Sequence, residues 1–422
     1  MTTASKEAGV RPPAQLAGRR RAAYRALTVA DLRGLARLGF DATLGVTDLV
    51  EQMHVTIGAW SAPLGPVRAL RTRGITGLVY DGVRGATRLL ALGTDASLRL
   101  IDPRGASAAP EPKREAVLAA LNGIWGDHLE ASGNALAIPM SFRIDGRCIE
   151  VTTDGLNAAL PEATGRIAIL VHGLCMNDLQ WRRKGHHHGA MLARELGYTV
   201  LALHYNSGLH ISDNGERFAA LLEHLIAQWP RSVEELVLVG HSMGGLVVRS
   251  ACQVAEEKHL AWRARLTRLV CMGTPHHGAV LERGGHLVDT ILGLSPYAAP
   301  FARLGQARSA GITDLRYGNV RRSDWAGRHP HEQKHDDRTP TPLPSGVQAY
   351  LLAATTAAEP RGLRHAVIGD GLVAVGSAWG EHRDKALALA VPASHRSLIT
   401  GTSHWNLLNH PAAADALRRW LA

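Results

Sequence analysis

The sequence predicts an α/β fold built on a doubly wound, mostly parallel sheet, and two observations carry this prediction. From about residue 140, short apolar runs alternate with helical stretches, and the runs lie at 166–171, 199–203, 235–239, 268–272 and 365–368. Near-continuous apolar strands separated by helices are typical of a parallel sheet covered on both faces, and right-handed crossovers make it doubly wound. Residues 141–152 precede this alternation and predict an antiparallel hairpin that leads into the sheet.

The pattern before residue 140 is helical. One segment places aliphatic residues on a single helical face, with arginines largely elsewhere, and that face holds Ile75, Leu78, Val79, Val83, Ala86 and Leu90. A second amphipathic segment groups Val117, Leu118, Leu121, Ile124, Trp125 and Leu129. A stretch at about 29–59 is apolar with a weaker period. We favour a helical subdomain packed on the sheet domain, and the alternative is a basic amphipathic surface that rests on a membrane.

These patterns divide the chain into segments. Residues 1–23 are polar and basic and predict a disordered tail, residues 24–135 form the helical N-terminal region, and residues 140–422 form the main domain. Within the main domain, the alternation stops between about 280 and 345, where we expect a cap or lid insertion. The part at 321–345 is rich in Arg, His, Asp and Pro, and we expect it to be an exposed loop.

Composition and charge exclude several classes of protein. The 422-residue chain carries a net charge of +10, but scattered arginines supply the excess, with one short run at Arg19, Arg20 and Arg21. Nucleic-acid binding is not expected, because a basic stripe with interleaved aromatic residues is missing. Four cysteines in a chain of this length do not make a disulfide framework, which indicates a reducing compartment.

The expected localisation follows from the N-terminal sequence and from the length of the apolar stretches. No apolar segment of the kind found in secretory signals follows the N-terminus, and no stretch reaches about 18 uninterrupted apolar residues. We therefore expect a cytoplasmic protein, associated with a membrane if the alternative for the helical region holds.

The strongest chemical signal is E-L-V-L-V-G-H-S-M-G-G-L-V-V-R-S at 235–250. It places Gly240, Ser242 and Gly244 in a G-x-S-x-G pattern directly after a strand run and directly before a helical run. This context is typical of a nucleophile elbow, in which a tight strand-to-helix turn exposes the serine and small neighbours relieve its contacts. Ser242 is therefore the predicted nucleophile.

A second signal, I-A-I-L-V-H-G-L-C at 167–175, ends a strand with His172 and Gly173. In an elbow-type site, the loop after this strand and the residue after the nucleophile each donate a backbone N–H to the oxyanion. We assign these donors to Leu174 and Met243. Cys175 has no matching base nearby in the sequence, and we interpret it as a structural residue of the loop.

A serine nucleophile needs a base and an acid, in the chain order Ser, acid, His. His404 follows a short strand run and precedes a helical end segment, which makes it the predicted base, with His410 as the fallback. Asp370 stands in V-I-G-D-G-L-V, just past a strand run, and is the predicted acid. Its carboxylate would hold the imidazole tautomer without taking the proton itself.

Together these motifs resemble a known superfamily. G-H-S-M-G-G, H-G-L, G-T-P-H-H-G-A at 273–279, D-G-L-V and G-T-S-H-W resemble bacterial lipases and esterases of the α/β-hydrolase superfamily, and G-T-P-H-H-G resembles GPI inositol-deacylase-like lipases in particular. The resemblance covers about residues 140–422. It implies an α/β-hydrolase fold without metal or organic cofactor, ester hydrolysis through an acyl-enzyme, and an apolar acyl groove under a mobile cap. The insert at 321–345 departs from the family pattern.

Weaker signals complete the set of candidates. Tyr205 and Asn206 follow a strand at the expected catalytic edge and could line the substrate site, with a structural turn as the alternative. The run from His186 to His188 has no zinc spacing, so we expect a solvated loop there and no metal site. The predicted function is hydrolysis of lipid-like or other apolar carboxylic esters. The alternatives are acyl transfer by the same triad and a non-enzymatic scaffold.

Overall fold

A computed structural model of the chain describes residues 28–59, 72, 74–101, 111–278, 309–327, 336–359 and 369–422. The predicted tail at 1–23, the strand run at 365–368 and most of the predicted cap lie outside the described residues. The chain divides into two compact units, of which one comprises Met1–Arg114 with Gly133–Leu136 and the other Glu115–Ser132 with Ala137–Ala422.

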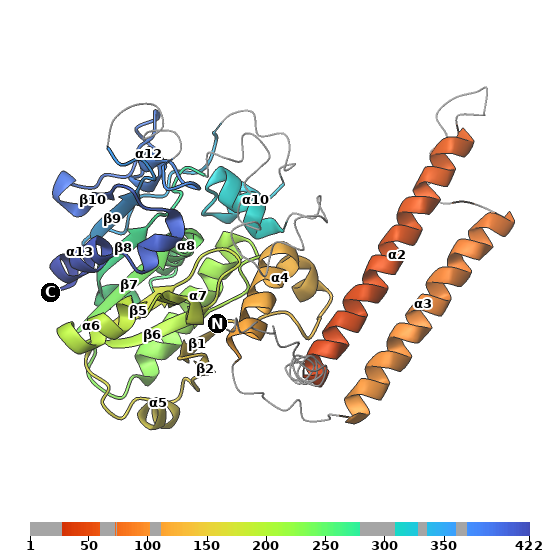
Figure 1. Ribbon diagram of the computed structural model, residues 1–422, viewed down its shortest axis with the longest axis horizontal. Coiled ribbons are helices and arrows are strands. Elements are labelled where there is room, and N and C mark those ends of the chain that lie inside the picture. Colours follow the sequence, from red (N-terminus) through yellow and green to blue (C-terminus); the bar gives the residue numbers. More distant parts are fainter. Residues whose placement is uncertain are drawn as a thin grey trace, which may run out of the picture. The chain divides into compact units, whose positions relative to one another are not determined.

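The second unit is built on a mixed sheet (Figure 1). Its described residues form eight strands in the order β10-β9-β8-β7-β3-β6-β1-β2. The strands span Ser141–Ile144 (β1), Arg147–Cys148 (β2), Arg166–Val171 (β3), Thr199–His204 (β6), Glu235–His241 (β7), Leu266–Met272 (β8), Gln348–Ala354 (β9) and Arg396–Ile399 (β10). From β10 to β6 all neighbours are parallel, whereas β1 is antiparallel to both β6 and β2. The predicted doubly wound, mostly parallel sheet with a leading hairpin is confirmed.

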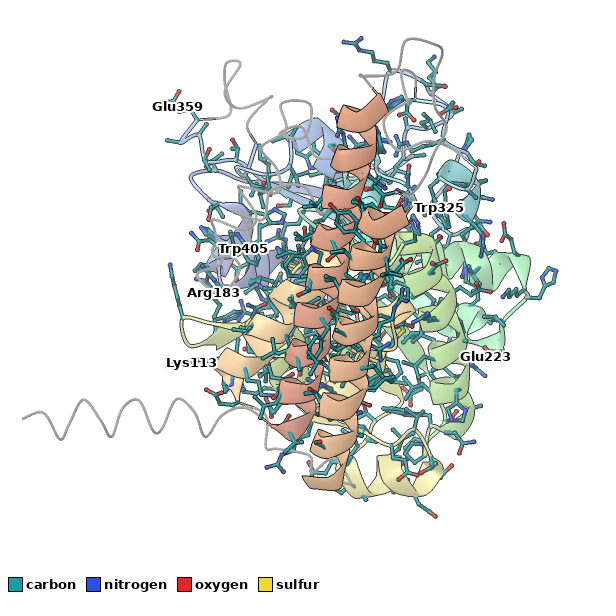
Figure 2. The ribbon with its side chains drawn as sticks, turned by 90° about the vertical axis from the view of Figure 1, so that its right-hand side faces the viewer. Lys113, Arg183, Glu223, Trp325, Glu359 and Trp405 are labelled. Atoms are coloured by element: carbon teal, nitrogen blue, oxygen red, sulfur yellow. The ribbon has the colours of Figure 1, made fainter. Side chains whose placement is uncertain are left out.

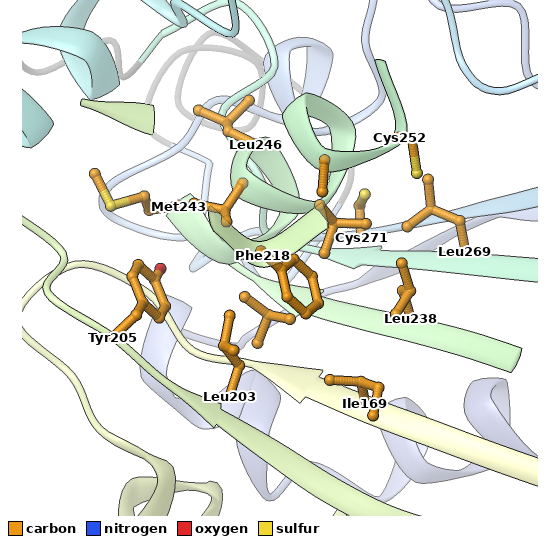
Figure 3. Packing of buried hydrophobic residues seen from close by; sticks show 14 of the residues in the cluster. Ile169, Leu203, Tyr205, Phe218, Leu238, Met243, Leu246, Cys252, Leu269 and Cys271 are labelled. Atoms are coloured by element: carbon orange, nitrogen blue, oxygen red, sulfur yellow. The ribbon is translucent and has the colours of Figure 1, made fainter. Parts of the chain in front are cut away.

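Helices cover both faces of this sheet. Side chains alternate along β3, so that Ile169 joins one buried apolar cluster with α7 (Ile211–Gln228) and α8 (Met243–Glu257). The next residue, Leu170, joins a second cluster with α6 (His188–Leu196) and α13 (Pro411–Leu421). Figure 3 shows the first cluster, where Phe218 of α7 and Leu246 of α8 lie over the strands. The core is thus two apolar layers separated by the sheet, which is the architecture of doubly wound α/β folds.

Shorter elements join these layers. Three short helices are α5 (Thr153–Ala159), α10 (Ala310–Tyr317) and α12 (Val375–Ala378). The 3-10 turns are η1 (Asp178–Trp181), η2 (Ala261–Arg265), η5 (Arg322–Asp324), η6 (Ala393–His395) and η7 (His404–Leu408). The two-residue strands β4 (Arg182–Arg183) and β5 (His186–His187) pair separately from the main sheet.

Helix α4 (Pro112–Ala131) belongs, from Glu115 onward, to the unit of the sheet. Its residues Ala120 and Ile124 are part of the same apolar cluster as α7 and α8. The sequence places these residues in the helical N-terminal region instead. The sequence pattern identifies the amphipathic helix but not the core against which its apolar face packs.

Two further features differ from expectation. Strand β9 has the sequence Q-A-Y-L-L-A-A, which lacks β-branched residues and fits a helix equally well, so the pattern does not predict it. The described residues between 321 and 345 are also partly buried. Asp324 is 1% exposed and accepts hydrogen bonds from the amides of Val320, Arg321 and Thr339, so it anchors the described part of this stretch, about half of whose residues are exposed as expected.

In the first unit, α2 (Val29–Ala59) and α3 (Gly74–Ile101) form an antiparallel hairpin, and Figures 1 and 2 show the two helices side by side. The ion pairs Arg33–Asp95 and Arg84–Asp48 set this antiparallel register. Among the described residues, no helix is both long enough and apolar enough to cross a membrane.

Candidate active site

The turn between β7 and α8 places Ser242 at the edge of the sheet. Its backbone angles are φ 56° and ψ −127°, a conformation that residues with a Cβ rarely adopt. The Ser242 amide donates a 2.8 Å hydrogen bond to the carbonyl of Met272 at the end of β8, and the Gly245 amide donates to the Ser242 carbonyl at 3.1 Å. The strained turn is therefore fixed on both sides by main-chain hydrogen bonds.

Glycines around Ser242 make this turn possible. A Cβ on Gly240 would lie 2.5 Å from the amide nitrogen of Gly245, inside van der Waals contact. A Cβ on Gly244 would overlap the carbonyl oxygen of Val171, the last residue of β3. Both obstacles are backbone atoms, which cannot move aside as a side chain can. Steric overlap with the backbone therefore explains why the motif has glycine at positions 240 and 244.

The loop after β3 approaches Ser242 closely. A Cβ on Gly173 would lie 2.9 Å from the Cβ of Ser242, so only glycine leaves room for this approach. Leu174 follows directly, and Met243 is the first residue of α8, where helix amides lack intrahelical acceptors. The two predicted oxyanion donors therefore lie in segments that flank the serine on either side.

Cys175 is not suited to nucleophilic attack. Its side chain is 2% exposed, and burial raises the pKa of its thiol to about 12, so the sulfur stays protonated near neutral pH. Its amide donates to Ser207 Oγ at 3.1 Å, which anchors the loop. These contacts agree with a structural role.

The structure brings Asp370 and His404 together. Asp370 Oδ2 lies 2.7 Å from His404 Nδ1, and both side chains are buried. Asp370 Oδ1 accepts from the amides of Leu372 and Val373 at 3.0 and 2.9 Å, while the His404 amide donates to the Asp370 carbonyl at 2.9 Å. The carboxylate is therefore held in one orientation, with one oxygen directed at the imidazole.

The ring of His404 lies next to the serine turn. A Cβ on Gly273 would be 3.1 Å from His404 Nδ1, and Gly273 directly follows Met272, which binds the Ser242 amide. The rings of His404 and His241 have centroids 4.8 Å apart, and His241 directly precedes Ser242. A bond from Ser242 Oγ to His404 Nε2 is not among the hydrogen bonds of the described residues, so this contact stays a prediction.

His241 is a contributor that sequence reasoning missed. Its Nε2 lies 3.3 Å from the carbonyl oxygen of His404, so the neutral ring can donate there and hold the backbone of the predicted base. Burial lowers the pKa of His241 well below its usual value, which keeps the ring uncharged beside the site. The sequence feature that could have identified His241 is its position directly before Ser242 in G-H-S-M-G.

The alternative histidines are engaged elsewhere. His410 Nδ1 accepts from the Ala412 amide and caps α13. His186 and His188 are joined by a 2.9 Å contact between ring nitrogens, and His188 Nε2 bonds the Leu407 carbonyl at 2.9 Å. Within the described part of the chain, no group of three or more His, Cys, Asp or Glu side chains is placed to hold a metal ion.

Tyr205 and Asn206 lie at the predicted edge with their polar atoms directed at the main chain. The Tyr205 hydroxyl donates to the His172 carbonyl at 2.7 Å, and its ring stacks on that of His172. Asn206 Nδ2 donates to the Gly126 carbonyl at 2.8 Å. These contacts hold the loop after β6, and substrate contact by either residue stays a prediction.

Comparisons with known proteins show a similarity over part of the chain. Residues 162–326 match the family model of the PGAP1-like alpha/beta domain. No curated protein sequence matches the chain.

Solved structures with a similar fold include the mature lipase BlEst2 of Bacillus licheniformis, at 19% identity and a TM-score of 0.40, over 61% of this chain and 92% of that chain. A thermophilic esterase of Thermogutta terrifontis is 15% identical with a TM-score of 0.37, over 67% of this chain and 93% of that chain. The phospholipase PlaB of Legionella pneumophila is 17% identical with a TM-score of 0.39, over 61% of this chain and 60% of that chain.

Proposed function

We propose that this α/β-hydrolase chain is a serine carboxylic-ester hydrolase, with Ser242 as nucleophile, His404 as general base and Asp370 as the orienting carboxylate. The observation that carries the proposal is the 2.7 Å contact from Asp370 Oδ2 to His404 Nδ1, next to a strained serine turn. The nucleophile, base and acid follow the chain order expected for this fold.

In the first half-reaction, Asp370 keeps the proton of His404 on Nδ1, which leaves the lone pair of Nε2 free. Nε2 takes the proton of Ser242 Oγ as this oxygen attacks the ester carbonyl carbon. The amides of Leu174 and Met243 donate to the resulting oxyanion, and each such donor is worth about 3 kcal/mol. The imidazolium then protonates the leaving alkoxide, and alcohol departs.

In the second half-reaction, a water molecule takes the place of the alcohol. His404 Nε2 accepts a proton from this water as its oxygen attacks the acyl-enzyme carbonyl. The same amides hold the second oxyanion. When it collapses, Ser242 Oγ leaves and regains the proton from His404, so the enzyme returns to its starting state and releases the acid.

The proposed substrate is a lipid-like or otherwise apolar ester. This part of the proposal is supported by the resemblance of the motif at 273–279 to GPI inositol-deacylase-like lipases and by the matched PGAP1-like domain. An alcohol in place of water at deacylation would make the same triad an acyltransferase, so added alcohol and product analysis separate the two reactions.

The test is hydrolysis of p-nitrophenyl acyl esters by the wild-type chain and by Ser242→Ala. We expect kcat to fall at least about 10⁴-fold, because the triad then lacks its nucleophile. A fluorophosphonate probe should label the wild type and not Ser242→Ala.

The matched control is Ser250→Ala, which removes a buried hydroxyl from the same helix, where Ser250 Oγ donates to the Val320 carbonyl. This variant should keep both turnover and labelling. Unchanged turnover in Ser242→Ala would exclude the proposed nucleophile, and absence of labelling in the wild type would favour a scaffold.

A further inference from the structure

The α2–α3 hairpin buries an ion-pair cluster between its helices, whereas Arg37, Asp81 and Arg88 are exposed. Arg84 is 4% exposed and reaches Asp48 at 2.6 Å and the carboxylate of Glu51, which is itself buried. Thr72 donates to Glu51 through its amide and its hydroxyl, at 3.0 and 2.7 Å. These hydrogen bonds lower the pKa of Glu51 to about 2, so the pair stays ionised at neutral pH. We call these residues, with the Arg33–Asp95 pair, the polar seam.

The apolar side chains of the same hairpin lie on the outside. Leu78 is 75% exposed and Leu89 is 72% exposed. The other large exposed apolar side chains described on these two helices are Leu32, Leu35, Val46, Val50, Val79, Val83, Leu90 and Leu92. We call these ten residues the apolar flanks. They include four of the residues that the sequence pattern places on one face of α3.

Helical geometry places the flanks and the seam on different sides of each helix. At about 100° per residue, Leu32 and Val50 fall on the same side of α2, while Glu51 lies about 100° away from Val50. On α3, Leu78 and Leu89 fall within about 20° of each other, and Arg84 lies about 120° from Leu78. Each helix therefore turns its buried charges toward its neighbour and its large apolar side chains away from it, next to exposed charges such as Asp81 and Arg88.

The positions of the polar seam and the apolar flanks indicate whether the hairpin suits water or an apolar medium. In water, apolar side chains are driven inward and charges outward. In an apolar medium, charged groups are paired inside and apolar groups face out. A segment that lies in the headgroup–acyl boundary has one face against acyl chains and the other against headgroups and water. The apolar flanks suit the acyl side of such a boundary, and the charge of the adjoining sequence separates lipid from a second copy of the chain.

The sequence at both ends of the hairpin is basic. Before α2, a single acid, Glu7, stands against Lys6, Arg11, Arg19, Arg20, Arg21 and Arg25. Between α2 and α3, residues 60–73 contain Arg68, Arg71 and Arg73 and no acid. Because the helices are antiparallel, these two basic segments adjoin opposite ends of α2. Positive charge at both ends complements anionic headgroups along one bilayer surface.

We propose that the α2–α3 hairpin lies in the headgroup–acyl boundary of a phospholipid bilayer, with its apolar flanks against acyl chains and its polar seam internal, and that the basic sequence next to it makes the bilayer an anionic one. The proposal rests on the hairpin alone and does not depend on the hydrolase activity proposed above.

The test is flotation of the full-length chain with vesicles of phosphatidylcholine, with and without phosphatidylglycerol. We expect strong binding to the mixed vesicles and weaker binding without the anionic lipid. The triple variant Leu78→Gln/Leu89→Gln/Leu90→Gln should bind the mixed vesicles at least about tenfold more weakly, because it removes three exposed apolar side chains while keeping good helix formers.

The matched control is Thr76→Gln/Ser97→Gln, which changes exposed polar positions of the same helix and should bind like the wild type. Circular dichroism confirms that both variants keep their helix content. Equal binding by the triple variant and the wild type would overturn the proposal. A wild-type dimer in sedimentation velocity that the triple variant dissociates, without vesicle binding, would overturn it in favour of a second copy.

Discussion

The sheet unit and the α2–α3 hairpin distribute polar and apolar side chains in opposite ways. In the sheet unit, Ile169 and Phe218 are fully buried between sheet and helices. In the hairpin, the buried side chains among the described residues are the polar ones of Asp31, Glu51, Arg84 and Thr87, while Leu89 is exposed. A surface that matches its medium is polar in water and apolar in lipid, and this difference is the basis for the proposal that the hairpin meets lipid.

The comparison also explains why the amphipathic pattern alone was ambiguous. The aliphatic face of α3 that the sequence predicts is present, but its members Leu78, Val79 and Leu90 are exposed. A period of 3.6 residues identifies an apolar face without saying what covers it. The partner of that face is decided by the tertiary arrangement.

The largest expected effect concerns Asp370, the buried carboxylate of the sheet unit. In Asp370→Asn, the amide can still accept from the Leu372 and Val373 amides but presents N–H to His404 Nδ1. The ring would then carry its proton on Nε2 and could not accept that of Ser242. We expect kcat for ester hydrolysis to fall about 10⁴-fold with little change in Tm.

Unchanged activity in Asp370→Asn would contradict the proposed role of this carboxylate in catalysis. If Asp370→Asn retains wild-type kcat, this carboxylate only stabilises the fold, as Glu51 does in the hairpin. Esterase kinetics together with differential scanning calorimetry separate these outcomes.

The second prediction compares the two kinds of apolar residue directly. Phe218→Ala removes a fully buried ring from the sheet unit and should lower the free energy of unfolding by about 3–5 kcal/mol. Leu89→Ala removes an exposed side chain from a flank and should change it by less than about 0.5 kcal/mol. Denaturant unfolding in lipid-free buffer measures both. A similar loss in Leu89→Ala would show that protein already covers the flank.

The third prediction uses acid. Burial lowers the pKa of His172 to about 4, whereas the histidine of an unfolded chain titrates near 6.5. Between these two values the unfolded chain binds a proton that the folded chain does not, so the free energy of unfolding falls as pH falls from 6.5 toward 4. His172 alone contributes on the order of 3 kcal/mol, and buried His241 and His276 act in the same direction.

The polar seam should respond differently over this window, because Glu51 has a pKa of about 2 and keeps its charge. Hydrogen exchange at pH 7 and pH 5, corrected for the intrinsic pH dependence, should therefore show loss of protection in peptides of the sheet unit before peptides of α3. Simultaneous loss in both units would contradict the expected contrast.

Much of the candidate site was predictable because its residues stand in short motifs at element ends. The strand run before Ser242 and the helical run after it are visible in the sequence, and the carboxyl ends of parallel strands meet at one edge. Asp370 and His404, 34 residues apart, were predicted from chain order and local context, and the structure places them in hydrogen-bond contact.

Other parts were not predictable in this way. Asp324 and Arg338 lie in a polar stretch typical of an exposed loop, yet Asp324 is buried and Arg338 donates to the carbonyls of His276 and Gly318. Polar composition indicates exposure only when no buried main-chain groups need partners. The position of His241 against His404 likewise depends on a contact across 163 residues.

The sequence by itself determined four strands of the parallel sheet (β3, β6, β7 and β8), the serine turn and the chain order of the predicted triad, because these depend on local periodicity and on glycines required by backbone geometry. Only the tertiary structure decided that the apolar side of α2 and α3 is the exposed side. It also decided that α4 joins the core of the sheet unit and how Asp370 is held against His404. The physical reason is that periodicity fixes the faces of an element, whereas burial and charge pairing depend on what each face meets.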